Sequence, residues 1–364
     1  MNKHLYHVIR RRNKVLVFVL VALWAPFLYH RLRPSRSKAT SVLPSDNYFE
    51  KQLKEIPHLY LEENLVSSQY EYTYVILPRH AAACGVSQSH YVMKDRSKRE
   101  TNNSTDFPVP NLNKIGQQRT LPLIMLFLVH SGASHFEHRR AIRETWGSVG
   151  KRLSRLVFIL GNPHNYTTQQ QVDTESSVHG DILQVDFYET YRNITLKAIM
   201  ALKWVTRYCP RAAYVTKVDD DMFVGVERIL SSAVGGGMDR RRLLLCKPNH
   251  DFKVTRDGKY QVPVSLYNAT RWPTFCFGGC WIASIDIIKK FYEEAMKTKQ
   301  IYLDDVFITG ILRLKIHLRL RRVRFSTNIF CHGRGDPENV RKFWKQRTEN
   351  FSVNPRKHWM SCYR

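Results

Sequence analysis

Apolar, strand-like runs alternate with helical segments in the middle of the chain, from Leu121 to Val218. The pattern predicts helices over residues 135–147 and 193–205, and strands over 121–131, 155–161, 181–187 and 212–218. Strands that alternate with helices are typical of a mostly parallel sheet with right-handed crossovers. Because ligands of such sheets bind beyond the carboxyl ends of the strands, the sequence predicts an α/β fold with a ligand site at that edge.

Three consecutive carboxylates, Asp219, Asp220 and Asp221, directly follow the last of these strands. Adjacent negative charges repel one another, whereas hard divalent cations such as Mg²⁺ and Mn²⁺ prefer carboxylate oxygens. The alternative is a solvated acidic turn. The triplet lies between an apolar strand and the apolar residues 222–224, which favours a metal site. A divalent ion there could neutralise a diphosphate.

The chain is strongly basic, with 57 lysines and arginines against 31 aspartates and glutamates and a formal net charge of +26. Such an excess suits an acidic partner, either a nucleic acid, a membrane surface or a phosphorylated small molecule. A hydrophobic share of 43% excludes a wholly disordered, collagenous or coiled-coil chain. A nucleic-acid partner is disfavoured, because the sequence has no aromatic-basic RNA motif and no zinc-ligand spacing.

An uncharged, apolar run over residues 15–29 is flanked on both sides by basic residues. It is shorter than the roughly 20 residues that a typical bilayer requires and overlaps the range of cleavable signal peptides. No cleavage site of the small-x-small type closes the run, and Trp24 and Tyr29 suit a membrane interface. We therefore predict a transmembrane signal anchor over 15–29 and a cytosolic tail over 1–14, with a cleaved signal peptide as the alternative.

Sequons and cysteines favour a lumenal location for the rest of the chain. Six asparagines begin an Asn-x-Ser/Thr sequon: Asn102, Asn103, Asn165, Asn193, Asn268 and Asn350. The seven cysteines are scattered rather than grouped in CxxC pairs, which favours disulfides over a zinc module. Because the number is odd, one cysteine is left over. Cys84 could be a free thiol, a link between two chains or a merely buried thiol.

Residues 30–118 are rich in Ser, Asn, Pro and charged residues and show no sustained hydrophobic period. This composition predicts a lumenal stem or a partly folded linker. The catalytic domain is then expected over residues 119–364.

Five motifs in a specific order carry a resemblance to a known family. They are RRAIRETWG at 139–147, DFYETYRNITLKA at 186–198, KVDDDMFV at 217–224, FGGCWIAS at 277–284 and DDVFITG at 304–310. Together they resemble the motifs of the beta-1,3-galactosyltransferase family of Golgi hexosyltransferases, glycosyltransferase family 31. The resemblance implies a GT-A type fold with a mostly parallel, Rossmann-like sheet, a UDP-sugar donor, Mn²⁺ as cofactor and inversion at the sugar carbon. It also implies a single-pass type II protein of the Golgi membrane.

The resemblance assigns a role to individual residues of each motif. It assigns donor contacts to a set of basic, acidic and glycine residues, Arg139, Arg140, Arg143, Lys217, Asp219, Asp220, Gly278 and Gly279. It assigns metal coordination to Asp221 and, as a second ligand, to His332. Asp305 takes the position of the general base that deprotonates the acceptor hydroxyl. The alternatives are an exposed basic helix face for the arginines, a structural role for His332, and a helix N-cap for the pair Asp304 and Asp305.

The chain departs from the family pattern at Asp304, where the change is mild, and at Cys280, in the segment that lines the sugar pocket. Asp304 replaces the usual Glu, and Cys280 stands where a glycine is common in the family's GGGY segment. Sugar selectivity is therefore open, and Cys280 could instead form a disulfide with Cys276.

The resemblance therefore implies an inverting beta-1,3-hexosyltransferase. It would move galactose, or N-acetylglucosamine, from a UDP-sugar to the hydroxyl of an acceptor glycan, with UDP-galactose favoured. The alternative is a catalytically silent relative that binds glycans or acts like a chaperone in the secretory pathway. No nucleic acid is expected as a partner, and the chain could form a homodimer.

Overall fold

The computed structural model describes residues 46–57, 72–79, 84, 123–320 and 330–353. All of them belong to one unit of the chain, residues 42–364. The predicted tail and anchor lie outside the described residues, as do the sequons at Asn102 and Asn103. Among the described helices, none has the length and apolar character needed to cross a membrane.

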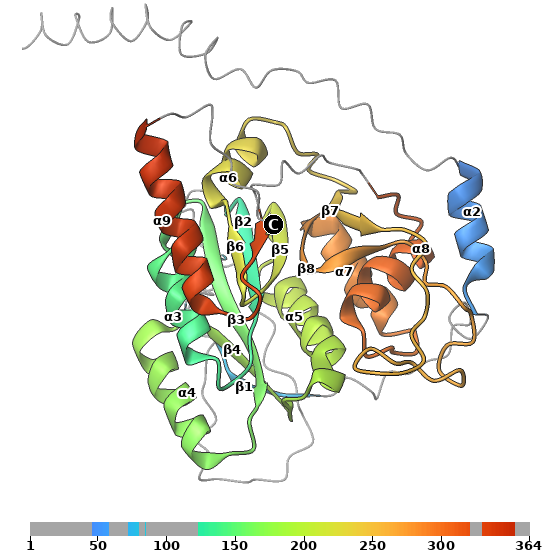
Figure 1. The fold of residues 1–364 in the computed structure, drawn as a ribbon, viewed down its shortest axis with the longest axis horizontal. Coiled ribbons are helices and arrows are strands. Elements are labelled where there is room, and N and C mark those ends of the chain that lie inside the picture. Colours follow the sequence, from blue (N-terminus) through green and yellow to red (C-terminus); the bar gives the residue numbers. More distant parts are fainter. Residues whose placement is uncertain (1–45, 58–71, 80–83, 85–122, 321–329, 354–364) are drawn as a thin grey trace, which may run out of the picture. The chain divides into compact units, whose positions relative to one another are not determined.

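A seven-stranded sheet forms the centre of this unit, with the strand order β1-β4-β3-β2-β5-β8-β7 (Figure 1). Its strands are β1 (Tyr74–Ile76), β2 (Met125–His130), β3 (Ser154–Asn162), β4 (Ile182–Tyr188), β5 (Tyr214–Asp219), β7 (Leu244–Asn249) and β8 (Phe275–Ser284). The four strands β4, β3, β2 and β5 pair in parallel, as predicted. The strands β1, β8 and β7 pair antiparallel with their neighbours, so the sheet is mixed rather than mostly parallel.

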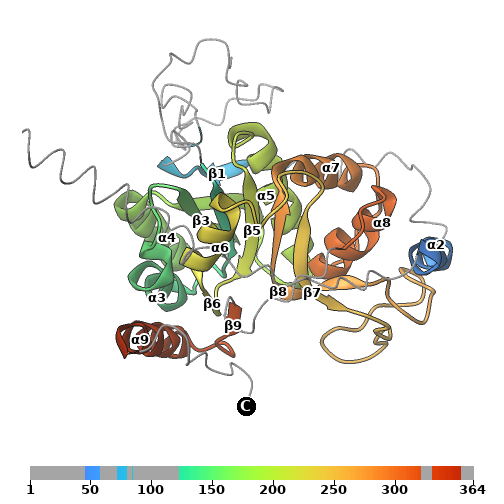
Figure 2. The same cartoon turned by 90° about the horizontal axis from the view of Figure 1, so that it is seen from above.

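Helices cover both faces of the sheet (Figure 2). One face packs against α5 (Ile194–Tyr208), α7 (Ile285–Ala295) and η8 (Asp305–Leu312), and the other against α3 (Phe136–Glu144), α4 (Tyr166–His179) and α6 (Val226–Val234). The helix α9 (Pro337–Val353) packs against α3. Side chains of β2 alternate between the two cores, because successive residues of a strand point to opposite faces. Leu126 and Leu128 join the first core, and Met125 and Phe127 join the second.

Parts of the predicted stem are built into this fold. The strand β1 extends the sheet beyond β4, and the helix α2 (Asp46–Glu55) packs against α8 (Arg313–Lys315). A disulfide joins Cys84 to Cys209, directly after α5. Cys84 is therefore neither a free thiol nor a link between chains.

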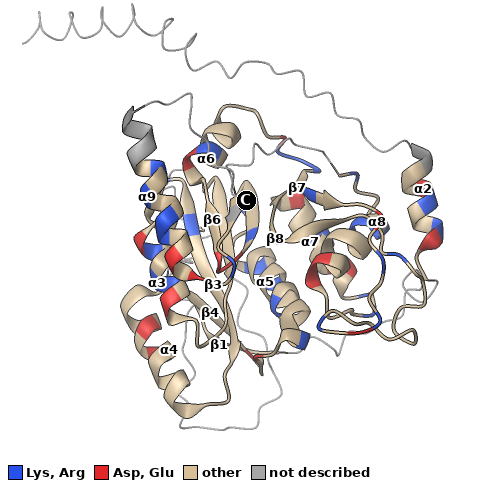
Figure 3. Cartoon of the chain, in the orientation of Figure 1, with Lys and Arg blue, Asp and Glu red and all other residues tan. Residues whose placement is uncertain are grey.

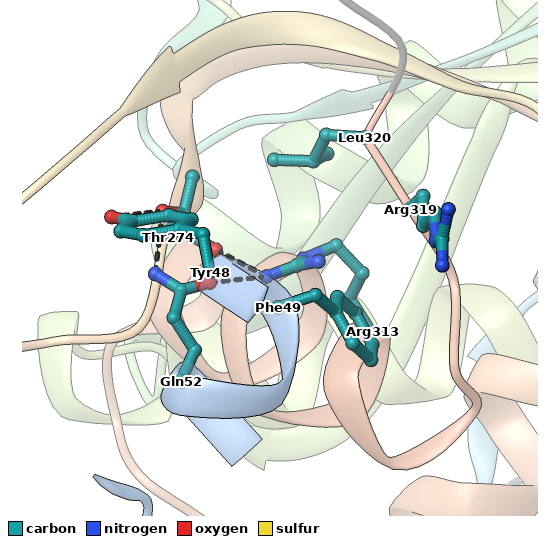
Figure 4. Close-up of a pocket in the computed structure, with 7 residues that line it drawn as sticks. All are labelled: Tyr48, Phe49, Gln52, Thr274, Arg313, Arg319 and Leu320. Carbon is teal, nitrogen blue, oxygen red and sulfur yellow. Dashed lines mark hydrogen bonds between the residues drawn. The ribbon is translucent and has the colours of Figure 1, made fainter. Parts of the chain in front are cut away.

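A buried arginine anchors α2 to the domain (Figure 4). Arg313 is 2% exposed and donates to the carbonyl oxygen of Thr274 at 3.0 Å and to Gln52 Oε1 at 3.3 Å. Gln52 in turn donates from Nε2 to Thr274 Oγ1 at 2.7 Å. A fragment that starts at residue 119 would lack Gln52, one of the acceptors of the buried Arg313 guanidinium. Leaving a buried donor without its acceptor is energetically costly.

A second disulfide among the described residues pairs Cys246 of β7 with Cys276 of β8, and Cys280 is a free thiol. The suggested bond between Cys276 and Cys280 is wrong. Both residues lie on β8, and four residues of a strand span roughly 13 Å, whereas disulfides need Cα atoms within about 7 Å. Burial raises the pKa of Cys280 far above its ordinary value, so the thiol stays protonated near neutral pH.

Candidate active site

The carboxyl ends of the four parallel strands open into a cleft of about 680 Å³. It is lined by residues that follow β2, β3 and β4 and by the aspartate triplet at the end of β5. This is the edge of the sheet at which the sequence predicts a ligand site.

The three aspartates have three different environments. Asp219 Oδ1 accepts a hydrogen bond from Lys217 Nζ at 2.6 Å. Asp220 is buried, and its Oδ2 accepts from Ser131 Oγ at 2.6 Å and lies 2.8 Å from His135 Nδ1. Asp221 Oδ2 accepts from the backbone N–H of Gly335 at 3.0 Å. Each carboxylate is thus held by its own partner, which a solvated acidic turn would not require.

Lys217 is a buried cation among these carboxylates. Its Nζ lies 2.6 Å from Asp219 Oδ1, 2.6 Å from the carbonyl oxygen of Gly278 and 3.3 Å from Asp304 Oδ2. Burial alone would lower its pKa, but Asp219 and Asp304 outweigh that effect and raise it. An ammonium group has three donors, and three protein groups face this one. Lys217 therefore serves as a counter-ion that joins β5, β8 and η8.

Asp305, the predicted general base, is the first residue of the π-helical segment η8 and is half-buried. Its Oδ1 accepts from the backbone N–H of Val306 at 2.8 Å. Burial and the neighbouring charge of Asp304 raise the pKa of Asp305 to about 7, which suits proton transfer near neutral pH. Asp304 makes no side-chain cap bond and contacts Lys217 instead, so the N-cap alternative is wrong for Asp304.

A short ribbon of β6 (Met222–Val224) and β9 (Phe330–His332) brings His332 to the triplet. His332 Nε2 lies 3.4 Å from Asp221 Oδ2. Neighbouring ligands on an octahedral ion with bonds of about 2.1 Å lie roughly 3 Å apart, so this oxygen and nitrogen fit one divalent cation. Nδ1 of His332 accepts from the Arg334 N–H at 2.8 Å, so the neutral ring carries its proton on Nε2. A cation bound through Nε2 therefore requires the tautomer of His332 that carries its proton on Nδ1.

The three arginines of α3 do not line the cleft. Arg139 is completely buried and donates to Glu175 Oε2 and to the carbonyl oxygen of Gly132, both at 2.6 Å. Arg143 pairs with Glu175 at 2.6 Å and with Asp181 at 2.8 Å. Arg139 thus holds the turn after β2, and Arg143 ties α3 to the ends of α4 and β4.

Arg140 is exposed and pairs with Glu137 at 2.8 Å, on a helix face where basic and acidic side chains are mixed (Figure 3). This placement matches the alternative of an exposed helix face. None of the three guanidinium groups is placed to contact a ligand in the cleft.

Several residues that line the cleft were missed by sequence reasoning. Lys197 Nζ donates to the carbonyl oxygen of Ser131 at 2.7 Å and pairs with Glu189 Oε1 at 2.6 Å. Tyr191 and His135 also line the cleft. Lys197, Glu189 and Tyr191 lie in the motif at 186–198, which runs from a predicted strand into a predicted helix. The available signal was therefore a charged pair and a tyrosine at this junction.

Comparison with known families identifies this arrangement. A sequence model described as galactosyltransferase matches residues 137–324, which is more than half of the chain and includes both acidic motifs. The chain belongs to the galactosyltransferase family. It is a glycosyltransferase enzyme of the hexosyltransferase type, as the sequence motifs predict.

Similar proteins of the galactosyltransferase family carry related names. Human beta-1,3-galactosyltransferase 5 is 33% identical over 220 residues, which are 59% of this chain and 70% of that protein. Mouse beta-1,3-galactosyltransferase 1 is 32% identical over 221 residues, which are 59% of this chain and 67% of that protein. The apo structure of the bifunctional glycosyltransferase WbbM aligns with a TM-score of 0.33 and 12% identity, over 57% of this chain and 40% of that chain. A similarity this low supports no conclusion about the fold or the function of this chain.

Proposed function

We propose that this enzyme is an inverting beta-1,3-hexosyltransferase. It moves galactose, or N-acetylglucosamine, from a UDP-sugar to a hydroxyl of an acceptor glycan on a glycoprotein or glycolipid. The main observation behind the proposal is one charged cluster, in which the Lys217 ammonium contacts both Asp219 and Asp304. Asp304 is next to Asp305 in the chain. Inverting transfer requires one carboxylate at the acceptor and preorganised charge at the leaving group. The names of the similar proteins support the linkage and the donor sugar.

On the donor side, Asp221 and His332 would hold Mn²⁺, and Asp219 would face the nucleotide. When bound, the ion offsets the negative charge that gathers on the leaving UDP. The mixed sheet, with its site at the carboxyl ends of the parallel strands, fits a GT-A type fold.

On the acceptor side, Asp305 accepts the hydroxyl proton as the oxygen attacks the anomeric carbon. Its Oδ1 is engaged by the Val306 N–H, which leaves Oδ2 for the proton. A Cβ atom added to Gly278 would lie 3.1 Å from this Oδ2, so the glycine keeps space beside the base.

An aromatic pair suits the acceptor sugar. Tyr191 lines the cleft, and its ring lies 6.0 Å from that of Tyr260, with Lys259 Nζ 4.7 Å from the Tyr191 ring. Burial, Tyr260 and Asp305 raise the pKa of Tyr191, so its hydroxyl stays protonated and can donate a hydrogen bond. Exposed faces of aromatic rings offer apolar area at low entropic cost. We assign Tyr191 and Tyr260 to the acceptor glycan.

We also propose a location in the Golgi membrane, with residues 15–29 as the anchor of a single-pass type II protein and the catalytic domain in the lumen. The apolar run with basic flanks and the sequons support this proposal.

The proposed function is tested by incubating the full-length protein with Mn²⁺, acceptor glycans and a panel of UDP-sugars. We expect transfer from UDP-galactose to give a product with a beta-1,3 linkage, which nuclear magnetic resonance of the product identifies. Transfer from UDP-N-acetylglucosamine instead would identify that molecule as the donor and would still support a hexosyltransferase reaction. Binding of UDP without transfer from any donor would indicate the catalytically silent relative.

Replacing Asp221 with alanine is expected to weaken Mn²⁺-dependent UDP binding by at least about tenfold, because a carboxylate ligand is lost. The fold should persist, since Asp221 is partly exposed and contributes little to packing. Calorimetric titration of UDP with and without Mn²⁺ measures the effect. Unchanged UDP affinity in the presence of Mn²⁺ would remove Asp221 from the metal site.

The transfer rate is expected to rise with pH through about 7, the raised pKa of Asp305. Only the ionised carboxylate can accept the hydroxyl proton, so kcat should fall about tenfold for each pH unit below this value and level off above it. A profile of kcat against pH measures this limb. A limb centred near pH 4, the ordinary range of aspartate, would show that the carboxylate is not perturbed in the working enzyme.

Replacing Gly278 with alanine is expected to lower kcat by about tenfold, because the new methyl group displaces the Asp305 carboxylate from its position. The matched control is Gly279→Ala, whose Cβ would meet the flexible side chain of Met222 at 3.0 Å. Steady-state kinetics of both variants with one donor and one acceptor make the comparison. Equal losses would show that the effect arises from the β8 backbone and not from the base.

A further inference from the structure

Two histidines next to the donor site have no role in the proposed reaction. His135 directly precedes α3, His138 lies on its first turn, and both approach Asp220, the middle residue of the triplet. One ligand atom from each of the three residues lies within 4.8 Å of the others. The His135 and His138 rings stack with their centroids 4.8 Å apart, and His135 Nδ1 lies 2.8 Å from Asp220 Oδ2.

Groups around this cluster already orient its donor atoms. His138 Nε2 lies 3.1 Å from the carbonyl oxygen of Gly335. Because a carbonyl only accepts, Nε2 carries the proton and the neutral ring keeps a lone pair on Nδ1. Asp220 accepts from Ser131 Oγ at 2.6 Å. Histidine ligands of metals usually donate their other N–H to a carbonyl or carboxylate, and ligating carboxylates are themselves hydrogen-bonded.

We propose that His135, His138 and Asp220 form a second divalent-metal site, separate from Asp221 and His332, that takes Zn²⁺. Two imidazoles and one carboxylate are a common zinc donor set, and imidazole nitrogen favours Zn²⁺ over Mn²⁺. Zinc bonds of about 2.0 to 2.2 Å require the three donor atoms to move closer together than 4.8 Å. The side chain of His135 is 47% exposed, so it can rotate and exchange its hydrogen bond to Asp220 for the ion.

Gly335 connects this second site to the site of the catalytic cation. Its carbonyl oxygen faces His138, and its N–H donates to Asp221 Oδ2 at 3.0 Å. Asp220 and Asp221 are also neighbours in the chain, so two cations at these carboxylates would repel each other. Zinc at the second site is therefore expected to weaken Mn²⁺ binding at Asp221.

The test is calorimetric titration of the full-length protein with Zn²⁺ alone, in the absence of nucleotide and Mn²⁺. We expect zinc to bind at this site, and excess Mn²⁺ to weaken its binding through the repulsion between the two ions without displacing it. His135→Gln and His138→Gln should each weaken this binding by at least about tenfold. The matched controls are Asp221→Asn, at the other site, and His164→Gln, an exposed histidine whose ring meets that of Tyr188 edge to face. Both controls should keep the wild-type zinc affinity.

Two outcomes would overturn the proposal. One is zinc binding that is unchanged in both His135→Gln and His138→Gln. The other is zinc binding that is lost in Asp221→Asn, which would place the ion at the site of the catalytic cation. Circular dichroism of each variant verifies that it is folded, as expected for substitutions of exposed or half-buried side chains.

Discussion

Replacing Asp305 with asparagine is expected to lower kcat by about two to four orders of magnitude, the usual effect of losing a positioned base. The amide has nearly the same size and can still accept the hydrogen bond that Val306 donates to Oδ1. It cannot accept a proton from the acceptor hydroxyl. Donor affinity should therefore change little, a pattern that marks an interaction made mainly in the transition state. Steady-state kinetics give kcat, and calorimetric titration with UDP and Mn²⁺ gives donor affinity.

The neighbouring variant Asp304→Asn separates catalysis from stability. Asp304 is buried and lies 3.3 Å from Lys217 Nζ, so its loss should lower the melting temperature more than the loss of the half-buried Asp305 does. Its activity at a temperature where the variant is folded should exceed that of Asp305→Asn. Equal activity losses, together with equal losses of stability, would show that the pair is structural and that the base lies elsewhere.

The parallel part of the sheet could be predicted because each of its strands is a continuous apolar run. The runs at 121–131, 155–161, 181–187 and 212–218 became β2, β3, β4 and β5. The helix α4 was missed because its sequence is polar and only Val172 is buried among its residues. The antiparallel strands carry no comparable signal. Strand β8 is interrupted in its middle by Gly278 and Gly279, and β1 is a three-residue strand within a polar segment.

The acidic part of the site could be predicted because topology alone places Asp219 to Asp221 at the carboxyl edge. The partners of the charged side chains could not be predicted from the sequence. A motif shows that Arg139 and Lys217 are present, but not that Glu175 and Asp304 face them across the fold. Such partners are distant in the sequence, and a buried charge requires them.

The cysteine pairs depend in the same way on contacts between distant segments. Cys84 and Cys209 are 125 residues apart, and nothing in the local sequence of either one indicates the other. Closing a loop of this length restricts the unfolded chain strongly. The bond, together with β1 and α2, shows that the segment predicted as stem supplies structure to the catalytic unit.

Replacing Lys217 with methionine is expected to lower the free energy of unfolding by about 3 to 5 kcal/mol at neutral pH, the usual cost of removing one partner from a buried ionic cluster. Methionine keeps the length of the side chain but leaves Asp219 and Asp304 without their shared cation. Burial already raises the pKa of Asp219 to about 7, and removing the ammonium raises it further.

In the variant the Asp219 carboxylate is charged above its folded pKa and protonated below it. The lost stability should therefore be largest at alkaline pH and shrink as the pH falls through the folded pKa of Asp219, which lies above about 7 in the variant, because protonation removes the repulsion. Denaturant unfolding on either side of this pH measures the difference. Lys289→Met is the matched control, since Lys289 forms an exposed pair with Glu293 and should contribute less than about 1 kcal/mol at either pH. A loss for Lys217→Met that is as small as that of the control and independent of pH would mean that the acidic cluster does not depend on this cation.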